Sequence, residues 1–140
     1  MAVQSQLDQY GHALIIDCHS FSEIPFERDL NNKCSRPDII GTDAFHTSQA
    51  LQDLTHQFFI SQGLSVGLDW PYLNHGVNGL LPANKRVQSI LIEVNRKLYL
   101  DAGTRTRNLH FNQIKSVLNH YLHLIRSNVN DIFYPINNES

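Results

Sequence analysis

Two short segments of this sequence carry the side chains best suited to chemistry. Residues 12–21 place Asp17 and His19 after a row of aliphatic residues. Residues 89–99 place Glu93 within a second aliphatic row. In α/β folds, ligands bind at the carboxyl ends of strands. An imidazole and a carboxylate that meet there predict a metal-assisted hydrolase, in which the imidazole binds the metal and the carboxylate acts on water.

His19 is the candidate metal ligand. A zinc ligand must be a neutral imidazole that is held rigidly, with its second nitrogen oriented by another group. The strand expected at residues 12–18 would supply the rigidity, although a loop histidine bonded to backbone has the same sequence context. Asp17 lies two residues earlier on the same strand face, so it either orients the ring or faces solvent. Ser20 would bind substrate or shape the turn.

Glu93 is the candidate general base, because it interrupts the apolar run of residues 87–94. A carboxylate buried there is costly unless it is paired or functional; the alternative is an edge-strand glutamate that faces water. Arg36 and Arg96 are candidates for holding a substrate carboxylate, since a guanidinium binds it bidentately, or else form structural ion pairs. His75 either contacts substrate or is an exposed loop histidine.

These residues fall within four motifs that occur in order along the chain. The motifs are Asp17-Cys-His-Ser20, Arg36-Pro-Asp-Ile-Ile-Gly-Thr-Asp43, Pro71-Tyr72 with His75-Gly76, and Ile92-Glu-Val-Asn-Arg-Lys-Leu-Tyr-Leu-Asp101. Together they resemble the N-formylglutamate amidohydrolase family, which shares its fold with zinc carboxypeptidases. The resemblance implies zinc-dependent hydrolysis of N-formyl-glutamate or another N-acyl amino acid, in histidine breakdown. It also implies His19 as a zinc ligand and Glu93 as the base.

The chain departs from the family in length. Family members are considerably longer, and the resemblance implies two further metal ligands in a missing amino-terminal half. A catalytic zinc normally has three protein ligands and a water, whereas the motifs here supply His19 alone. The competing interpretation is a truncated or degenerate relative without activity, which would be a folded remnant or a module completed by another polypeptide. We therefore expect weak zinc binding. We also expect self-association, with residues 87–94 the strand at greatest risk if it lies at an exposed edge.

Composition excludes several other classes of protein. The 140 residues carry a formal net charge of −2, which leaves no basic surface for nucleic acid or for a membrane. No apolar run approaches the length of a membrane span, and the first residues lack the pattern of a secretory signal. The two cysteines, Cys18 and Cys34, fit a reducing cytoplasm. The sequence also lacks the glycine-rich motifs of serine hydrolases and of nucleotide-binding proteins.

Strands that alternate with helices predict a single α/β domain over residues 1–127. We expect three α/β/α layers around a mostly parallel or mixed sheet, resembling part of the zinc carboxypeptidase-like fold. Cys18 is expected to be a small buried residue, and Leu109 and Leu122 to lie on the buried stripe of the last helix. Residues 128–140 are expected to form a frayed polar tail. The periodicity predicts helices over residues 3–10, 47–62 and 108–125 and strands over 12–18, 38–40, 64–68 and 87–94.

Overall fold

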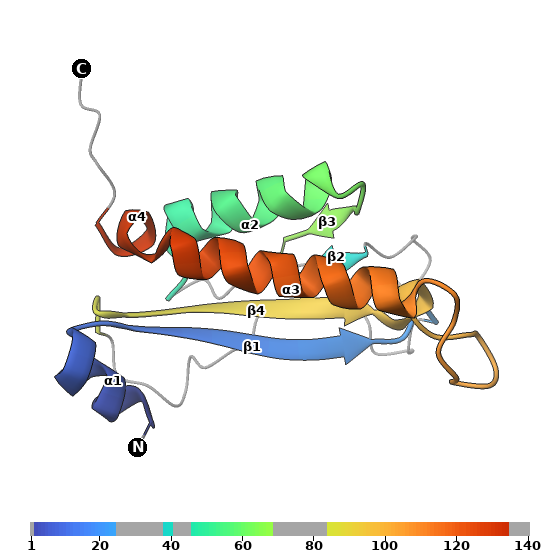
Figure 1. Ribbon diagram of the computed structural model, residues 1–140, viewed down its shortest axis with the longest axis horizontal. Helices are drawn as coiled ribbons and strands as arrows, with labels where there is room; N and C mark the ends of the chain where they lie inside the picture. The colour runs from blue at the N-terminus through green and yellow to red at the C-terminus, as the bar shows by residue number, and fades with distance from the viewer. Residues whose placement is uncertain (1, 25–37, 41–45, 69–83, 135–140) are drawn as a thin grey trace.

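The computed structural model describes residues 2–24, 38–40, 46–68 and 84–134. A mixed sheet lies between α2 and α3 on one face and α1 on the other (Figure 1). The predicted three-layer α/β fold is therefore confirmed. The elements are α1 (Ala2–Tyr10), β1 (Ala13–Phe21), β2 (Ile39–Ile40), α2 (Gln49–Ser61), β3 (Val66–Gly67), β4 (Val87–Asn95), the 3-10 helix η2 (Arg96–Leu98), α3 (Phe111–Ser127) and α4 (Val129–Phe133).

The sheet is built around β4. The strand order is β1-β4-β2-β3, and β1 runs parallel to β4 in a register that pairs Ala13 with Val87 and Phe21 with Asn95. β2 pairs antiparallel with β4 and parallel with β3. The strand at residues 87–94, which we expected to be at greatest risk of unwanted pairing, is thus flanked on both sides. In the part of the chain that the structure describes, β1 takes the edge instead.

One face of the sheet is covered by α1 at the amino-terminal ends of β1 and β4. α1 ends at Gly11, whose φ of +79° lies in the left-handed region that favours glycine. The chain then turns back, and Leu7 packs against Ala13 and Val87. The carboxyl-terminal ends of the two strands lie away from α1 (Figure 1). This helix therefore positions the strands without covering the ends that carry the candidate site.

The opposite face of the sheet carries the main core. Ile90, Ile92 and Val94 alternate along β4 on the side of α2 and α3, as a strand period of two requires. The Ser48 side chain caps α2 by accepting a hydrogen bond from the Leu51 amide at 3.2 Å. Other members of this core are Ile39, Leu51, Phe59, Ile114, Tyr121, Ile125 and Ile132. Packing against α2 and α3 therefore fixes the position of β4.

Some local expectations were wrong. β1 continues to Phe21, so His19 lies inside the strand and not after it. Cys18 is exposed because β1 is an edge strand. Leu109 is 98% exposed because α3 begins only at Phe111, beyond it.

Two further differences concern the carboxyl-terminal region. Leu122 is 45% exposed, so the apolar stripe of α3 is wider than the surface that the sheet covers. Residues 129–133, which we expected to fray, form α4 and bury Ile132 against the core. The sequence signal for this helix was weak. Its apolar residues, Val129, Ile132 and Phe133, lie among polar neighbours, so the polar composition of the segment predicted a frayed tail.

Candidate active site at the ends of two strands

The structure brings His19 and Glu93 together. They are direct partners in the register of β1 and β4, so their side chains share one face of the sheet. His19 Nδ1 lies 4.0 Å from Glu93 Oε1. This is too long for a hydrogen bond, but it leaves both groups within reach of one water or ion between them. Matching strand positions were the sequence signal for this pair.

Asp17 orients the His19 ring. Its Oδ1 lies 2.9 Å from His19 Nε2, from the same face of the same strand. An ionised carboxylate only accepts hydrogen bonds, so Nε2 is the donor and carries the proton. In the neutral tautomer, the other ring nitrogen, Nδ1, has a free lone pair on the side of Glu93. A carboxylate on one nitrogen that leaves the second free is the arrangement found behind metal-binding histidines.

Glu93 and His19 lie in different environments. The Glu93 side chain is 15% exposed, whereas that of His19 is 53% exposed. Burial raises the pKa of Glu93 above its usual value, and the neighbouring His19 opposes this. The Asp17 charge raises the pKa further, while Arg96 lowers it. The net upward shift makes Glu93 a better proton acceptor near neutral pH than an exposed glutamate.

Arg96 joins the end of β4 to the end of β1. Its Nε donates to Ser20 Oγ at 3.2 Å, and its Nη2 donates to the Ser20 carbonyl at 3.1 Å. In this structure Arg96 therefore has a structural contact, and Ser20 is its acceptor. Two of the five guanidinium N–H groups are used in this way, so further donors remain for a ligand.

A second polar group near the end of β4 had no predicted role. Lys97 Nζ lies 3.2 Å from Asp38 Oδ1, and Asp38 Oδ2 accepts from both the amide and the hydroxyl of Ser65 at 3.0 Å. Asp38 thereby ties β2 and β3 to η2. Its place in the second family-like motif was the signal available in the sequence. We assign this group to holding the sheet and not to chemistry.

Other predicted site residues are not tested by the geometry. Arg36 and His75 lie outside the described residues. Within those residues, no group of three His, Cys, Asp or Glu side chains is arranged to hold a metal ion. His120 and His123, which are three residues apart on α3, are both exposed.

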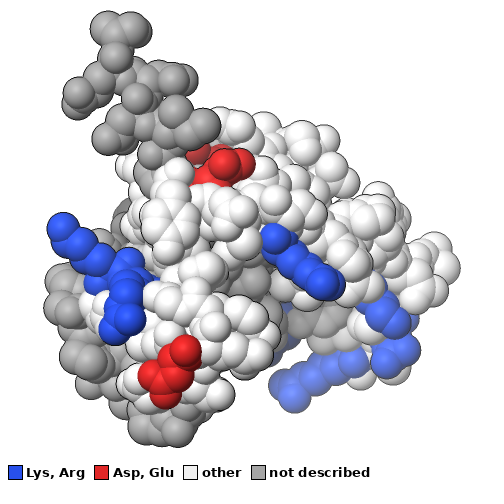
Figure 2. Space-filling view, turned by 60° about the vertical axis from the view of Figure 1, so that its left-hand side comes forward, with Lys and Arg blue, Asp and Glu red and all other residues white. Residues whose placement is uncertain are grey.

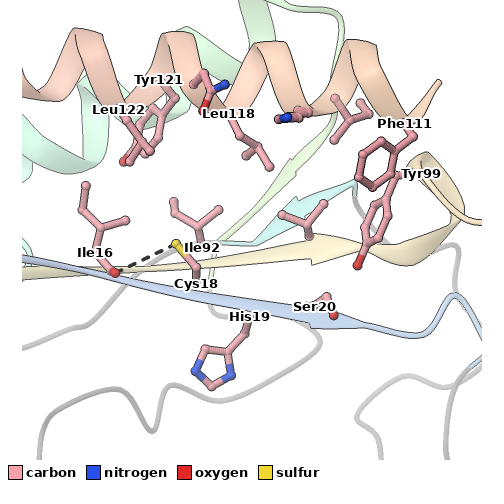
Figure 3. Close-up of a pocket in the computed structure, with 14 residues that line it drawn as sticks. Ile16, Cys18, His19, Ser20, Ile92, Tyr99, Phe111, Leu118, Tyr121 and Leu122 are labelled. Atoms are coloured by element: carbon pink, nitrogen blue, oxygen red, sulfur yellow. Dashed lines mark hydrogen bonds between the residues drawn. The ribbon is translucent and has the colours of Figure 1, made fainter. Parts of the chain in front are cut away.

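An apolar groove of about 610 Å³ lies on the other face of β1, against α3. Apolar side chains of the groove include Ile16, Ile92, Phe111, Leu118 and Leu122. His19 borders it, but its ring points away from α3 (Figure 3). The groove is therefore separate from the side of β1 where His19 meets Glu93.

Comparison with known proteins identifies the family. A sequence model described as FGase, N-formylglutamate amidohydrolase, matches residues 1–100. The chain belongs to the N-formylglutamate amidohydrolase family. The matched range contains Asp17, His19, Glu93 and Arg96. A search of curated proteins found no match to this family member.

A solved structure shows the same fold. The crystal structure of N-formylglutamate amidohydrolase from Ralstonia eutropha JMP134 superposes with a TM-score of 0.75 and 23% sequence identity. The match covers 90% of this chain and 49% of that protein. The family member described here therefore spans about half the length of its solved relative.

Surface charge and helix length agree with the composition. Lys and Arg side chains are scattered over the face shown in Figure 2 and do not gather into one patch. None of the helices in the described ranges is both long enough and apolar enough to cross a membrane.

Proposed function

We propose that this chain hydrolyses the amide bond of N-formyl-glutamate or a related N-acyl amino acid. The observation that carries the proposal is the placement of Glu93 4.0 Å from a histidine whose other nitrogen contacts Asp17. The substrate class comes from the family and from the printed name of the solved relative. Histidine breakdown in the cytoplasm is the setting that we expect for this reaction.

Zinc is the cofactor that we propose for the site. His19 fits one ligand position, because Asp17 fixes the ring and leaves Nδ1 free to coordinate. When bound, zinc would polarise the acyl carbonyl and lower the pKa of a bound water. His19 alone would hold it weakly, since catalytic zinc usually has three protein ligands.

Glu93 is the residue that we assign to proton transfer. Its carboxylate would accept a proton from the water that attacks the acyl carbon, and would return it to the nitrogen as the C–N bond breaks. The products are formate, or another carboxylate, and the free amino acid, so one water is consumed for each amide cleaved. Burial favours this role because it raises the pKa of Glu93 toward the working range of a general base.

Binding of the substrate carboxylate is assigned to arginine. Arg96 lies close enough to lower the pKa of Glu93, and it keeps N–H donors beyond those that contact Ser20. Arg36 and His75 are proposed as further substrate contacts from the family-like motifs alone. A bidentate guanidinium contact would orient the substrate and place its amide near Glu93.

The test is formate release from N-formyl-L-glutamate by the purified chain with added zinc. We expect measurable turnover, and Glu93→Gln to lower it about 10²-fold or more, as loss of a general base does. Glu23→Gln, in which an exposed carboxylate just after β1 is changed, is the matched control and should retain the rate. A folded, zinc-supplemented chain that releases no formate would contradict the proposal. That result would favour the non-catalytic interpretation.

A further inference from the structure

Arg96 binds Ser20 through one edge of its guanidinium. Nε donates to Ser20 Oγ at 3.2 Å, and Nη2 donates to the Ser20 carbonyl at 3.1 Å. These two donors lie side by side in the guanidinium plane, so Ser20 occupies that whole edge. The end of the guanidinium, formed by Nη1 and the second N–H of Nη2, makes no hydrogen bond within the described part of the chain. Arg96 therefore keeps one complete bidentate face for a ligand.

The backbone of Arg96 is held independently of its side chain. The buried Asn95 side chain caps η2 by accepting from the Lys97 amide at 3.1 Å. The Arg96 carbonyl accepts from the Leu100 amide at 2.9 Å. The freedom that would remain to Arg96 is rotation about its side-chain bonds. The two bonds to Ser20 limit that rotation.

The neighbouring cation, Lys97, is already paired. Its Nζ lies 3.2 Å from Asp38 Oδ1. Arg96, in contrast, is exposed and forms no ion pair with any carboxylate among the described residues. A guanidinium is always charged, and its planar fork matches a carboxylate. The free end of Arg96 therefore favours a ligand carboxylate.

This free end lies beside the candidate active site. Ser20 directly follows His19 on β1, at the carboxyl end of the strand (Figure 3). Arg96 lies three residues after Glu93, where β4 ends. It is close enough for its charge to lower the pKa of the Glu93 carboxyl group. A carboxylate bound to Arg96 would therefore lie near the proposed base.

We propose that Ser20 is a positioning residue that preorganises Arg96 for the substrate carboxylate. The inference rests on the proposed function, in which Arg96 binds that carboxylate. A long side chain that rotates freely loses conformational entropy when it binds a ligand, and this loss weakens binding. The bonds to Ser20 impose part of that order before the substrate arrives. Ser20 thus acts on affinity through Arg96, and not on the proton transfer assigned to Glu93.

The hydroxyl and the carbonyl of Ser20 can be separated by substitution. Ser20→Ala removes the Oγ acceptor and leaves the carbonyl. One hydrogen bond allows the guanidinium to swing about it, whereas two bonds fix its plane. Ser20→Thr keeps the hydroxyl, and a β-branched residue suits a strand. The two variants therefore form a matched pair that differs at the Oγ acceptor.

The test is calorimetric titration of N-formyl-L-glutamate, with added zinc, into the full chain carrying Glu93→Gln, so that affinity is measured without turnover. Adding Ser20→Ala to this parent should raise the Kd about three- to tenfold, the range for ordering one long side chain. Ser20→Thr should keep the affinity of the parent. Arg96→Ala should weaken binding more than Ser20→Ala does, because it removes the binding group itself. Thermal unfolding confirms that each variant folds.

The two monoamides of the ligand separate positioning from a general loss of structure. N-formyl-L-glutamine lacks the side-chain carboxylate, and N-formyl-L-isoglutamine lacks the α-carboxylate. Arg96→Ala should leave the affinity unchanged for one of them, the one without the carboxylate that Arg96 binds. The effect of Ser20→Ala should disappear for that same monoamide.

The outcomes distinguish this inference from the proposed function. A folded Ser20→Ala variant with the affinity of the parent, or an equal loss for all three ligands, would overturn the inference. A parent that binds none of the ligands would overturn it as well. Binding with the expected pattern, together with no formate release by the natural chain, would contradict the proposed function and leave the positioning role of Ser20 standing.

Discussion

β1 and β4 have similar sequences but different environments. Both strands have nine residues, both are rich in aliphatic side chains, and they pair in parallel over their full length. β4 is buried along nearly its whole length because it lies inside the sheet and packs into the main core, whereas most of β1 is half-buried or exposed. Position in the sheet, and not local sequence, therefore decides how much of each strand is buried.

The same difference divides the candidate site. Glu93 comes from the interior strand, and burial raises the pKa of its carboxyl group. His19 comes from the edge strand, and its side chain remains 53% exposed. The buried member is suited to exchanging a proton and the exposed member to meeting an ion or ligand from solution.

Matched isoleucines test the difference in burial. Ile90 and Ile16 are direct partners in the register, and Ile90 is 1% exposed whereas Ile16 is partly buried. We expect Ile90→Ala to lower the free energy of unfolding by about 3–4 kcal/mol, and Ile16→Ala by about 1–2 kcal/mol, because less packing is lost at the edge. Urea unfolding below the concentration of self-association measures both. Equal losses would mean that β1 is covered as fully as β4.

Most of the fold followed from periodicity. Helical periodicity over residues 47–62 predicted α2, and rows of aliphatic residues predicted β1 and β4. Strand order did not follow, because nothing local in residues 87–94 shows that two strands flank them. The exposure of Cys18 was missed for the same reason. Burial at an edge depends on neighbours that are distant in sequence.

The candidate site was predictable in part. Asp17 and His19 share a face by strand period, and Glu93 was marked by its charge within an apolar run. Similar strand positions predicted that His19 and Glu93 would meet, but the exact register that makes them direct partners depends on how β1 and β4 align. The contact of Arg96 with Ser20 could not be predicted either, because the two residues are 76 positions apart in the sequence. Long-range pairing is the part of the geometry that spacing does not encode.

Zinc binding tests whether the exposed strand end is the ligand position. We expect weak binding in calorimetry, and His19→Ala to lower the affinity at least about tenfold because it removes the ligand nitrogen. Asp17→Asn should lower it less, through a poorly oriented ring. His110→Ala, which changes an exposed histidine just before α3, is the control. Tight binding of one zinc that survives His19→Ala would place the metal elsewhere.

Arg96 tests how firmly the interior strand holds the edge strand at the site. Its two hydrogen bonds to Ser20 are solvent-exposed. We therefore expect Arg96→Ala to cost only about 0.5–1 kcal/mol of unfolding free energy. Arg126→Ala, at an exposed position in the last turn of α3, is the control and should cost less. A loss of several kcal/mol would show that the end of β1 depends on this clamp.

The smallest effect is the pH dependence that Glu93 gives to stability. Folding raises the pKa of Glu93, so the folded state binds its proton more tightly than the unfolded state. Between the unfolded pKa, about 4.3 for glutamate, and the higher folded pKa, the folded state holds more protons. Stability must therefore fall as pH rises through that window. Below it, both states are protonated and the effect disappears.

Urea unfolding at a series of pH values, in chelator to exclude metals, measures this slope. The difference in unfolding free energy between the natural chain and Glu93→Gln isolates it, because glutamine does not titrate. As pH rises through the window, we expect the natural chain to lose unfolding free energy relative to Glu93→Gln. Above the window, the difference should level off. The same comparison for Glu23→Gln should be flat, since that side chain is exposed. A slope of the opposite sign at Glu93 would mean that its charged form is stabilised, and that the interior strand does not prepare it as a base.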